Sequence, residues 1–324
     1  MNQWWVVPGD AGGISELRRV DVPAPGPAQV QIKIEAAAIN RGELLARPMM
    51  TIANAAARPR PSGIEYSGTV AEVGSGVERW SVGQRVMGRG SGCHAEYTVE
   101  AADGVMAIPD GLSFEEAATI PNVFVTAHDA LVTNACLQPG NSVLITAGSS
   151  GVGTAAIQIA RRMGAARVIA TSRSTKKSAS LRQLGATATV DTSEASWEQS
   201  LVKEHGEIDI VIDQVGGSHF SPCLRTLAVQ GKYVSVGRTG GSESTIDLDL
   251  VARKRLTLIG VTFRSRTGDE ALTCSRRFAD DLLSGFEDGS LRPVLDRSFP
   301  LSDLPAAHEY MRSDRQIGKI VLVA

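Results

Sequence analysis

Cysteine is scarce in this sequence, and the cysteines present do not cluster. The 324 residues include four cysteines, which stand far apart and form no Cys-x-x-Cys pair. Structural zinc sites and disulfide frameworks draw on closely spaced cysteines, so this spacing argues against both. Isolated thiols are typical of a reducing compartment, which predicts a cytoplasmic protein.

Long apolar runs and blocks of like charge are also missing. No stretch of about 18 apolar residues occurs. The first residues, MNQWWVVPGDAGG, lack the basic and apolar regions of a secretory signal. Lysine and arginine total 33 against 35 aspartates and glutamates, interspersed along the chain, for a net charge of −2. We therefore expect neither nucleic acid nor a membrane as a partner, but a small-molecule substrate.

The segments that are present change character along the chain. Residues 30–108 hold β-rich runs such as VQIKIEAAAI, YSGTVAEVG and HAEYTVEA, separated by glycine and proline, which predicts an antiparallel, barrel-like unit. From residue 113 helical segments alternate with apolar strands such as SVLIT, RVIAT and IDIVID, which predicts a doubly wound parallel sheet. The last part, from residue 261, ends in the strand-like GKIVLVA, which we expect to fold back on the first unit. The prediction is an α/β protein of two domains.

A glycine-rich turn stands between the first strand and the first helix of the predicted parallel sheet. Residues 142–156 read SVLITAGSSGVGTAA, in which an apolar strand runs into a helix that starts near Gly151. Glycines let a pyrophosphate approach the backbone, and the free N–H groups of a helix start stabilise its charge. Gly153 would let the helix lie close to the sheet. An ordinary strand-to-helix turn is the alternative interpretation, because a lone glycine turn is weak evidence.

The end of the second strand bears on the choice of cofactor. An NAD site usually has an acidic residue there to bind the ribose 2′-hydroxyl. This sequence has Ser172 and Arg173, followed by Lys176 and Lys177, which are hydroxyl and cationic groups suited to a 2′-phosphate. The pattern favours NADPH, and a solvated basic loop before a helix is the alternative.

Several longer segments occur together in a characteristic order. They are AAAINRGELLARP, PSGIEYSGTVAEVGSGVERWSVGQRVMG, HAEYTV, AATIPNVFVTAHDAL, LQPGNSVLITAGSSGVG, VIDQVGG, LAVQGKYVSVG and GKIVLVA. This order resembles the medium-chain dehydrogenase/reductase superfamily and, within it, the zinc-free, NADPH-dependent quinone oxidoreductases (ζ-crystallin-like). The matching segments cover nearly the whole chain.

The resemblance implies two domains with different functions. Residues 1–121 and 262–324 would form a GroES-like substrate domain, residues 122–261 a Rossmann NADPH-binding domain, and the cleft where they meet the active site. The resemblance places three sets of residues along the cofactor. Beside the pyrophosphate it places Gly148, Ser149, Ser150, Gly151 and Val152, and beside the 2′-phosphate it places Ser172, Arg173 and Lys177. Beside the nicotinamide it places Thr126, Gly237, Arg238, Val261 and Phe263.

The sequence departs from the family pattern at three places. Ser150 replaces the middle glycine of the turn, and Glu43 stands where the family often has aspartate. Aromatic residues that line the cleft in some quinone reductases are missing, and Met49, Met50 and Thr51 occupy that region.

The ligands of a catalytic zinc are also missing. In the zinc alcohol dehydrogenases of this fold a cysteine stands near the position of Asn40 and a histidine precedes the glutamate that matches Glu65, whereas this chain has Ile39-Asn40 and Ile64-Glu65. Without a Lewis acid, alcohol oxidation has no evident driving group. A quinone, or an alkene conjugated to a carbonyl, is already electrophilic and accepts hydride once it is aligned with the nicotinamide. The sequence therefore predicts a metal-independent quinone or enone reductase.

The groups that would assist this transfer are less evident. Asn40 is a candidate for orienting the substrate carbonyl, and a turn-forming asparagine is an equal alternative. Cys93 and His94 would point to opposite faces if they lay on a strand, so we do not expect them to act together. His128 is more consistent with a structural histidine than with a proton donor.

The sequence leaves two other functions open and predicts one oligomeric state. An enoyl-thioester reductase shares the fold, but we find no tyrosine in the expected cleft segments. A non-catalytic NADPH-binding sensor or interaction protein is also possible, because a fold does not fix a function. The segment Ser242–Leu258 reads as β-rich and could pair edge to edge with its twin, which predicts a homodimer.

Overall fold

The computed structural model describes residues 1–45, 54 and 56–324 and divides the chain into two compact units. Unit 1 comprises Met1–Asn122, Ser275–Asp288 and Arg292–Ala324, and unit 2 comprises Val123–Cys274 and Gly289–Leu291. Residues 262–274, which we expected in the substrate domain, therefore belong to the second unit. Met49, Met50 and Thr51 lie outside the described residues.

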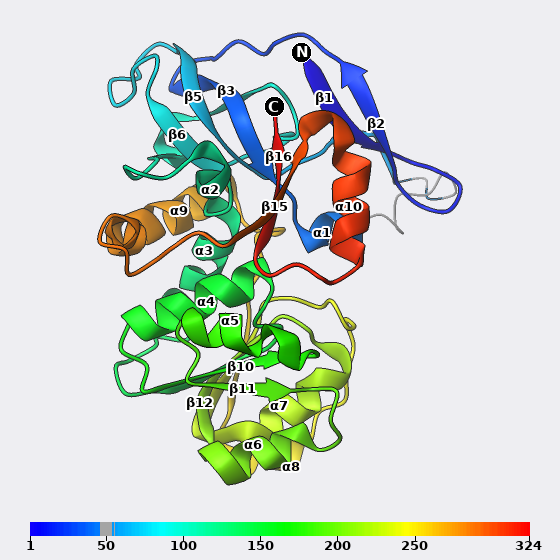
Figure 1. Ribbon diagram of the computed structural model, residues 1–324, viewed down its shortest axis with the longest axis vertical. Helices are drawn as coiled ribbons and strands as arrows, with labels where there is room; N and C mark the ends of the chain where they lie inside the picture. The colour runs from blue at the N-terminus through cyan, green and yellow to red at the C-terminus, as the bar shows by residue number, and fades with distance from the viewer. Residues whose placement is uncertain (46–53, 55) are drawn as a thin grey trace. The chain divides into compact units, whose positions relative to one another are not determined.

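Unit 1 contains two sheets (Figure 1). A three-stranded sheet has the order β2-β1-β4, and a larger one has the order β15-β16-β3-β5-β6-β8, with β7 also paired to β3. The strands are β1 (Asn2–Val7), β2 (Ile14–Arg19), β3 (Gln29–Ala38), β4 (Arg60–Pro61), β5 (Glu65–Val73), β6 (Arg85–Arg89), β7 (Tyr97–Ala101), β8 (Val105–Ala107), β15 (Leu295–Pro300) and β16 (Lys319–Val323).

The expected return of the chain end to the first unit is confirmed. β16 pairs antiparallel with β3, with Val321 opposite Ala38, so the two ends of the chain share one sheet. On β3, Lys33 is exposed between the buried Ile32 and Ile34, whereas the last residues of the strand, Ala36–Ala38, are buried on both faces. Short helices flank these strands, namely α1 (Arg41–Leu45), α2 (Phe114–Ala118) and α10 (Leu304–Arg312).

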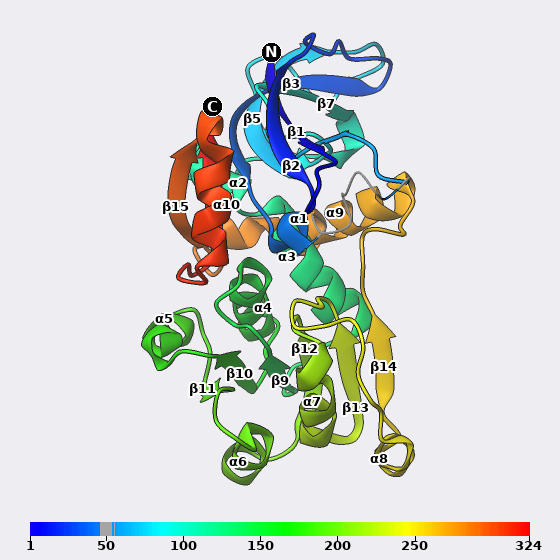
Figure 2. The same cartoon turned by 90° about the vertical axis from the view of Figure 1, so that its right-hand side faces the viewer.

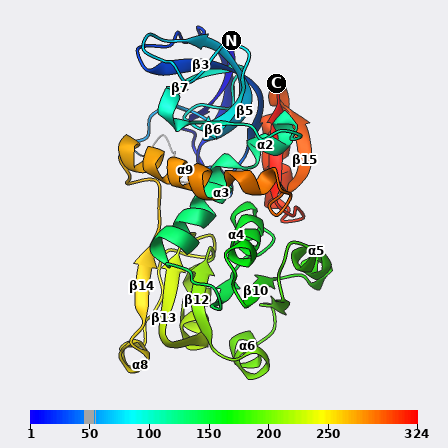
Figure 3. The same cartoon turned by 90° about the vertical axis from the view of Figure 1, so that its left-hand side faces the viewer.

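Unit 2 is a parallel sheet with helices on both sides (Figures 2 and 3). Its strand order, β11-β10-β9-β12-β13-β14, is that of the Rossmann fold when counted from β9. The strands are β9 (Ser142–Ile145), β10 (Arg167–Ser172), β11 (Ala188–Asp191), β12 (Ile208–Asp213), β13 (Leu227–Ser235) and β14 (Thr257–Gly260). The helices are α4 (Gly151–Arg162), α5 (Ser178–Gln183), α6 (Trp197–His205), α7 (Phe220–Thr226) and α8 (Leu248–Lys254), and α3 (Pro121–His128) and α9 (Gly268–Leu282) hold residues of both units. The predicted doubly wound sheet is confirmed.

The expectation of a β-rich segment over Ser242–Leu258 is wrong for most of its length. Residues Leu248–Lys254 form helix α8, and only the short strand β14 follows. The Asp247 carboxylate caps the helix by accepting a hydrogen bond from Leu250 N, and Arg255 ends it in the left-handed conformation. Capping and an Asp249–Arg253 ion pair one turn apart override an alternating pattern that is typical of a strand.

Candidate functional site

Most of the predicted cofactor-binding residues meet at one edge of the unit 2 sheet. Parallel strands bring their carboxyl ends to the same edge, and ligands of such sheets bind there, at the point where the strand order reverses. In this sheet that point lies between β9 and β12. The predicted residues that follow β9, β10, β13 and β14 are, in that order, Gly148 to Val152; Ser172, at the last position of its strand, Arg173 and Lys177; Gly237 and Arg238; and Val261 and Phe263.

The turn after β9 presents the start of a helix. Ser150, the residue that departs from the family glycine, caps α4: its Oγ accepts from Gly153 N at 3.0 Å and donates to Gln214 Oε1 at 2.7 Å. A Cβ on Gly153 would lie 2.5 Å from the Ala147 carbonyl oxygen, so only glycine lets the helix start this close to the turn. The serine therefore replaces backbone flexibility with a hydrogen-bonded cap, and the amide groups of the helix start are suited to an anion.

A buried carboxylate at the end of β12 organises the neighbouring loops. Asp213 is fully buried and accepts hydrogen bonds from Thr146 Oγ1 at 2.6 Å, from Val215 N and Gly216 N at 2.9 Å each, and from the Tyr233 hydroxyl. Proximity to this carboxylate and burial raise the pKa of Tyr233, with burial the larger cause. Sequence reasoning missed this role, although the segment VIDQVGG contains the aspartate.

The predicted cationic group lies beside the glycine turn. Lys177 Nζ donates to Ser149 Oγ at 3.4 Å, a contact that joins the β10–α5 segment to the turn after β9. Ser172 Oγ accepts from Ser174 N at 3.2 Å, and Arg173 is exposed. The structure thus brings together a hydroxyl, a lysine and the backbone of the turn, as a phosphate site requires.

The remaining predicted residues of unit 2 are held by their own contacts. A Cβ on Gly237 would lie 2.5 Å from the Gln214 carbonyl oxygen, so glycine is needed for this close approach. The Phe263 ring carries the Arg266 guanidinium at 4.8 Å from its centroid. Thr126 lies on α3 and is 9% exposed, so the protein itself covers most of its surface.

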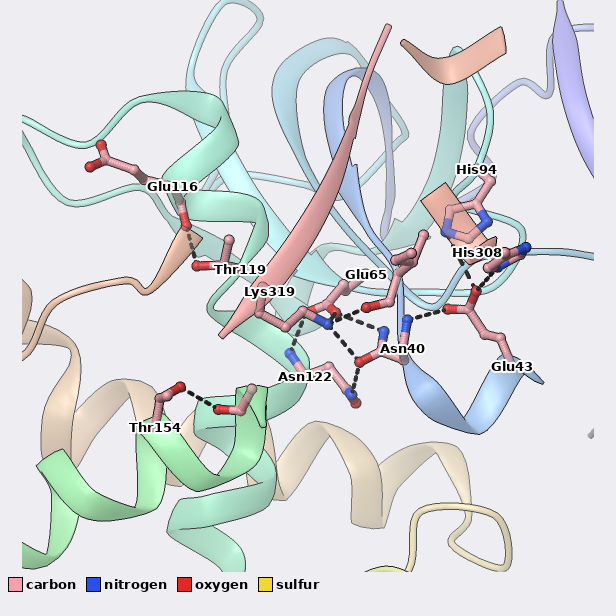
Figure 4. A network of polar contacts seen from close by, with 12 residues as sticks. Asn40, Glu43, Glu65, His94, Glu116, Thr119, Asn122, Thr154, His308 and Lys319 are labelled. Atoms are coloured by element: carbon pink, nitrogen blue, oxygen red, sulfur yellow. Dashed lines mark hydrogen bonds and ion pairs between the residues drawn. The ribbon is translucent and has the colours of Figure 1, made fainter. Parts of the chain in front are cut away.

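A second polar network lies in unit 1 and is centred on a buried ion pair (Figure 4). Lys319 Nζ, at the start of β16, donates three hydrogen bonds of 2.7 Å, to Ile39 O, Asn40 Oδ1 and Glu65 Oε1. Asn40 Nδ2 donates to the same Glu65 oxygen at 2.8 Å, and Asn122 N, at the start of α3, donates to Glu65 Oε2 at 2.8 Å. Sequence reasoning singled out Asn40 alone, because Lys319 lies 279 residues away from it.

The network differs in exposure between its ionic and its amide members. Glu65 is fully buried and Lys319 is 4% exposed, whereas Asn40 and Asn122 are only partly buried. The Asn122 amide also donates to Asn40 Oδ1, at 2.9 Å. A ligand that approaches this network therefore meets the amides before the charges.

A cluster of titratable groups adjoins the network. Glu43 Oε1 accepts from Asn40 N at 3.1 Å, and its Oε2 lies 3.4 Å from His308 Nε2 and 3.9 Å from His94 Nε2. Burial raises the pKa of Glu43 and is opposed by the nearby His94, while burial lowers the pKa of His94. Both shifts have the same physical cause, because burial disfavours the charged form of each group.

Three residues that the sequence offers as candidate catalytic groups are Cys93, His94 and His128. We expected Cys93 and His94 to lie on a strand, which is wrong: β7 begins only at Tyr97. Cys93 packs in the core of unit 1, where burial raises its thiol pKa, and His94 shares a 3.0 Å hydrogen bond with Ser62. His128 is buried at the end of α3. All three side chains are therefore buried within the protein.

Two family models match the chain. The model for the GroES-like domain of alcohol dehydrogenases matches residues 26–130, and the model for zinc-binding dehydrogenases matches residues 151–277. Human quinone oxidoreductase is 32% identical over 312 residues, which cover 94% of this chain and 92% of that protein. The polyketide synthase GfsB of Streptomyces halstedii is 36% identical over 299 residues, or 91% of this chain, but the match spans only 5% of its length.

Solved structures agree with these relatives. The quinone oxidoreductase of Thermus thermophilus, solved with and without NADPH, superposes with a TM-score of 0.84 at 28% identity and covers both chains completely. The CurK enoyl reductase superposes with a TM-score of 0.85 at 25% identity, over 99% of this chain and 98% of that one.

The fold, the site and these relatives together define the class of the protein. It is an α/β oxidoreductase with a Rossmann unit and a GroES-like unit. More particularly, the chain belongs to the medium-chain dehydrogenase/reductase superfamily, among the relatives of the quinone oxidoreductases. Among its described residues, no helix is long and apolar enough to cross a membrane.

Proposed function

We propose that the protein is an NADPH-dependent reductase that transfers hydride to a quinone or to an α,β-unsaturated carbonyl compound. The observation that carries this proposal is the site at the sheet edge of unit 2, where Lys177 reaches the glycine turn and Ser150 caps the helix that follows. The Thermus relative, solved with NADPH, supports the choice of cofactor. When bound, the cofactor would supply the hydride, and a proton from solvent or from a side-chain donor would complete the two-electron reduction.

Each group of residues has a proposed task at this cofactor. The amides of residues 148–152 would bind the pyrophosphate, and Ser172, Arg173 and Lys177 would bind the 2′-phosphate. Thr126, Gly237, Arg238, Val261 and Phe263 would lie at the nicotinamide. The sheet-edge positions of all but Thr126 support this assignment, since the residues follow the carboxyl ends of adjacent strands.

The proposed task of unit 1 is to bind the acceptor. Residues 1–121 and 262–324 were assigned to a substrate domain. We retain that assignment with Asn122 added to it and with residues 262–274 and 289–291 moved to the Rossmann unit. Asn40 would donate a hydrogen bond to the acceptor carbonyl. A metal is not needed for this step, and the Lys319 ammonium already supplies a cation between Asn40 and Glu65.

A turnover screen with NADPH tests the proposed function. The acceptors are a benzoquinone, an enone, an alkenal and an enoyl thioester, each followed by the loss of NADPH absorbance. We expect the highest kcat/KM with the quinone or the enone. Tight NADPH binding without turnover of any acceptor would reject the enzyme assignment and favour a cofactor-binding sensor.

A specific observation favours a second candidate. The similarity to the CurK enoyl reductase covers nearly the whole chain, so an enoyl thioester is the main alternative acceptor. A kcat/KM at least tenfold higher for an enoyl thioester than for any quinone or simple enone would select this alternative.

We also propose a homodimer formed through unit 2. Strand β14 is the edge of its sheet, and Leu258 on it is 41% exposed, with Leu248 at 71% and Ile246 at 42% close by in the chain. An unpaired edge with exposed apolar side chains is suited to pairing with a second copy. Light scattering should report twice the 34.2 kDa chain mass, and a monomer at micromolar concentration would reject the dimer.

We also propose a cytoplasmic location. None of the four cysteines forms a disulfide in the structure, and reduced thiols are typical of a reducing compartment.

A further inference from the structure

The side-chain amide of Asn40 can adopt only one orientation in its network. An ammonium has donors and no acceptor, so the Asn40 atom that faces Lys319 must be the oxygen. An ionised carboxylate has acceptors and no donor, so the atom that faces Glu65 must be the nitrogen. A flipped amide would place a donor against the ammonium and an acceptor against the carboxylate, losing both hydrogen bonds.

The hydrogen-bond count of this amide leaves one group for a ligand. Asn40 Oδ1 accepts from Lys319 Nζ at 2.7 Å and from Asn122 Nδ2 at 2.9 Å, which uses both of its lone pairs. Asn40 Nδ2 donates one hydrogen to Glu65. Within the described residues, its second hydrogen has no acceptor among these contacts, and the side chain is partly exposed. The network therefore presents a donor of fixed direction.

We infer that Lys319 and Glu65 are positioning residues for the reduction, because they aim the second Nδ2 hydrogen of Asn40 at the acceptor's carbonyl oxygen. This inference rests on the proposed function and extends it to two residues that would not touch the substrate. The substrate class it selects has an oxygen acceptor conjugated to the reacting carbon. Hydride addition moves negative charge onto that oxygen, so a donor already held in place favours the transition state.

The arrangement also explains the use of a buried ion pair where one polar group would suffice. Buried ion pairs add little stability over well-packed apolar residues of similar size, and in some proteins they are retained because they impose specificity. Here the pair imposes the orientation of one amide. A neutral pair in place of Lys319 and Glu65 could hydrogen-bond with the Asn40 amide in either orientation.

A kinetic double-mutant cycle tests whether Lys319 acts through Asn40. The variants are Asn40→Ala, Lys319→Met and the double variant, with Lys33→Met as the control because Lys33 is an exposed lysine of unit 1 that pairs with Glu35. We expect kcat to fall roughly tenfold in each single variant and no further in the double variant. Once Asn40 is replaced by alanine, Lys319 has no amide left to orient, so its loss has no additional effect on kcat. NADPH affinity and the Lys33→Met rate should stay within about twofold of the wild type.

Glu65→Gln provides a second variant if Lys319→Met does not fold. Glutamine keeps the shape of Glu65 but offers both a donor and an acceptor, so only Lys319 still opposes a flip of the Asn40 amide. We expect a several-fold fall in kcat that disappears in an Asn40→Ala background. Losses that multiply in either cycle, giving roughly a hundredfold in a double variant, would overturn the inference.

A measurement on the wild type separates the inference from the proposed function. In ¹⁵N NMR spectra of the full chain, the Asn40 side-chain signals are identified by their absence in Asn40→Ala. We expect two resolved hydrogens, one protected from exchange by Glu65 and one exchanging faster. Equal exchange of both would overturn the inference even with an active enzyme, whereas an inactive enzyme with the expected spectrum would reject only the proposed reaction.

Discussion

The candidate site of each unit contains a fully buried carboxylate, and the two carboxylates are held in different ways. Asp213 in unit 2 accepts from two hydroxyls and two backbone N–H groups and has no cation among its hydrogen-bond partners in the described part of the chain. Glu65 in unit 1 accepts from the Lys319 ammonium, the Asn40 amide and one backbone N–H. Both carboxylates are fully buried.

The difference corresponds to what each carboxylate holds in place, which is a backbone loop in unit 2 and a side-chain amide in unit 1. Asp213 bonds directly to backbone groups of the loop after its own strand, so its charge sets the course of the chain at the sheet edge. Glu65 acts with Lys319 as a nearly neutral pair, and the pair orients a side chain. Backbone shape can bind the pyrophosphate of a cofactor, whereas a carbonyl acceptor requires a donor with a direction.

The largest effect is expected from breaking the unit 2 network with Asp213→Asn. Val215 N and Gly216 N bind different oxygens of the carboxylate, so an asparagine would turn its NH₂ toward one backbone donor. Leaving buried donors unsatisfied next to a lost charge should lower the free energy of unfolding by about 3–5 kcal/mol. Chemical denaturation measures this loss.

Asp209→Asn is the matched control for that variant. Ser142 N and Ser142 Oγ both bind Oδ2 of Asp209, so an asparagine can keep both contacts with its single oxygen. We expect a change of less than about 1 kcal/mol for this control. Equal losses in the two variants would show that charge alone, and not the division of donors between two oxygens, stabilises the sheet edge.

The two networks also differ in how far the sequence reveals them. The unit 2 site follows strand ends, and strands with glycine turns leave local patterns, so residues such as Gly148, Gly153 and Lys177 could be proposed before the structure was known. The partners of Asn40 come from β5, α3 and β16, and no local pattern connects segments so distant in the chain. Helix α8 was missed because its alternating residues are typical of a strand, while its capping contacts are visible only in the structure.

The next effect concerns the cations of unit 2, in the double variant Arg173→Ala/Lys177→Ala. Loss of two charge-assisted contacts to a 2′-phosphate should cost about 2–4 kcal/mol of NADPH binding and leave NADH binding nearly unchanged. Fluorescence titration with both cofactors measures the preference. Lys176→Ala serves as the control, since Lys176 is an exposed neighbour in the same segment. Wild-type protein that binds both cofactors equally would contradict the assignment of this site.

A smaller effect is expected in unit 1 from Asn40→Ala. Loss of one orienting hydrogen bond should lower kcat about tenfold, or about 1.4 kcal/mol, without abolishing turnover. NADPH affinity should not change, because the proposed cofactor contacts belong to unit 2 and do not include Asn40. Complete loss of turnover, in a folded variant that still binds NADPH, would mean that Asn40 takes part in the chemistry itself.

The smallest effect is expected from removing metal ions. The Lys319 ammonium already lies within 2.7 Å of Ile39 O, Asn40 Oδ1 and Glu65 Oε1, and a divalent cation among the same oxygens would face a fixed positive charge. Within the described part of the chain, no group of three or more His, Cys, Asp or Glu side chains is arranged to hold a metal. Dialysis against a chelator should therefore leave kcat unchanged, and elemental analysis of active protein should find zinc well below one ion per chain. Activity that falls with the chelator and returns with zinc would show that a metal, and not the Lys319–Glu65 pair, prepares unit 1 for its acceptor.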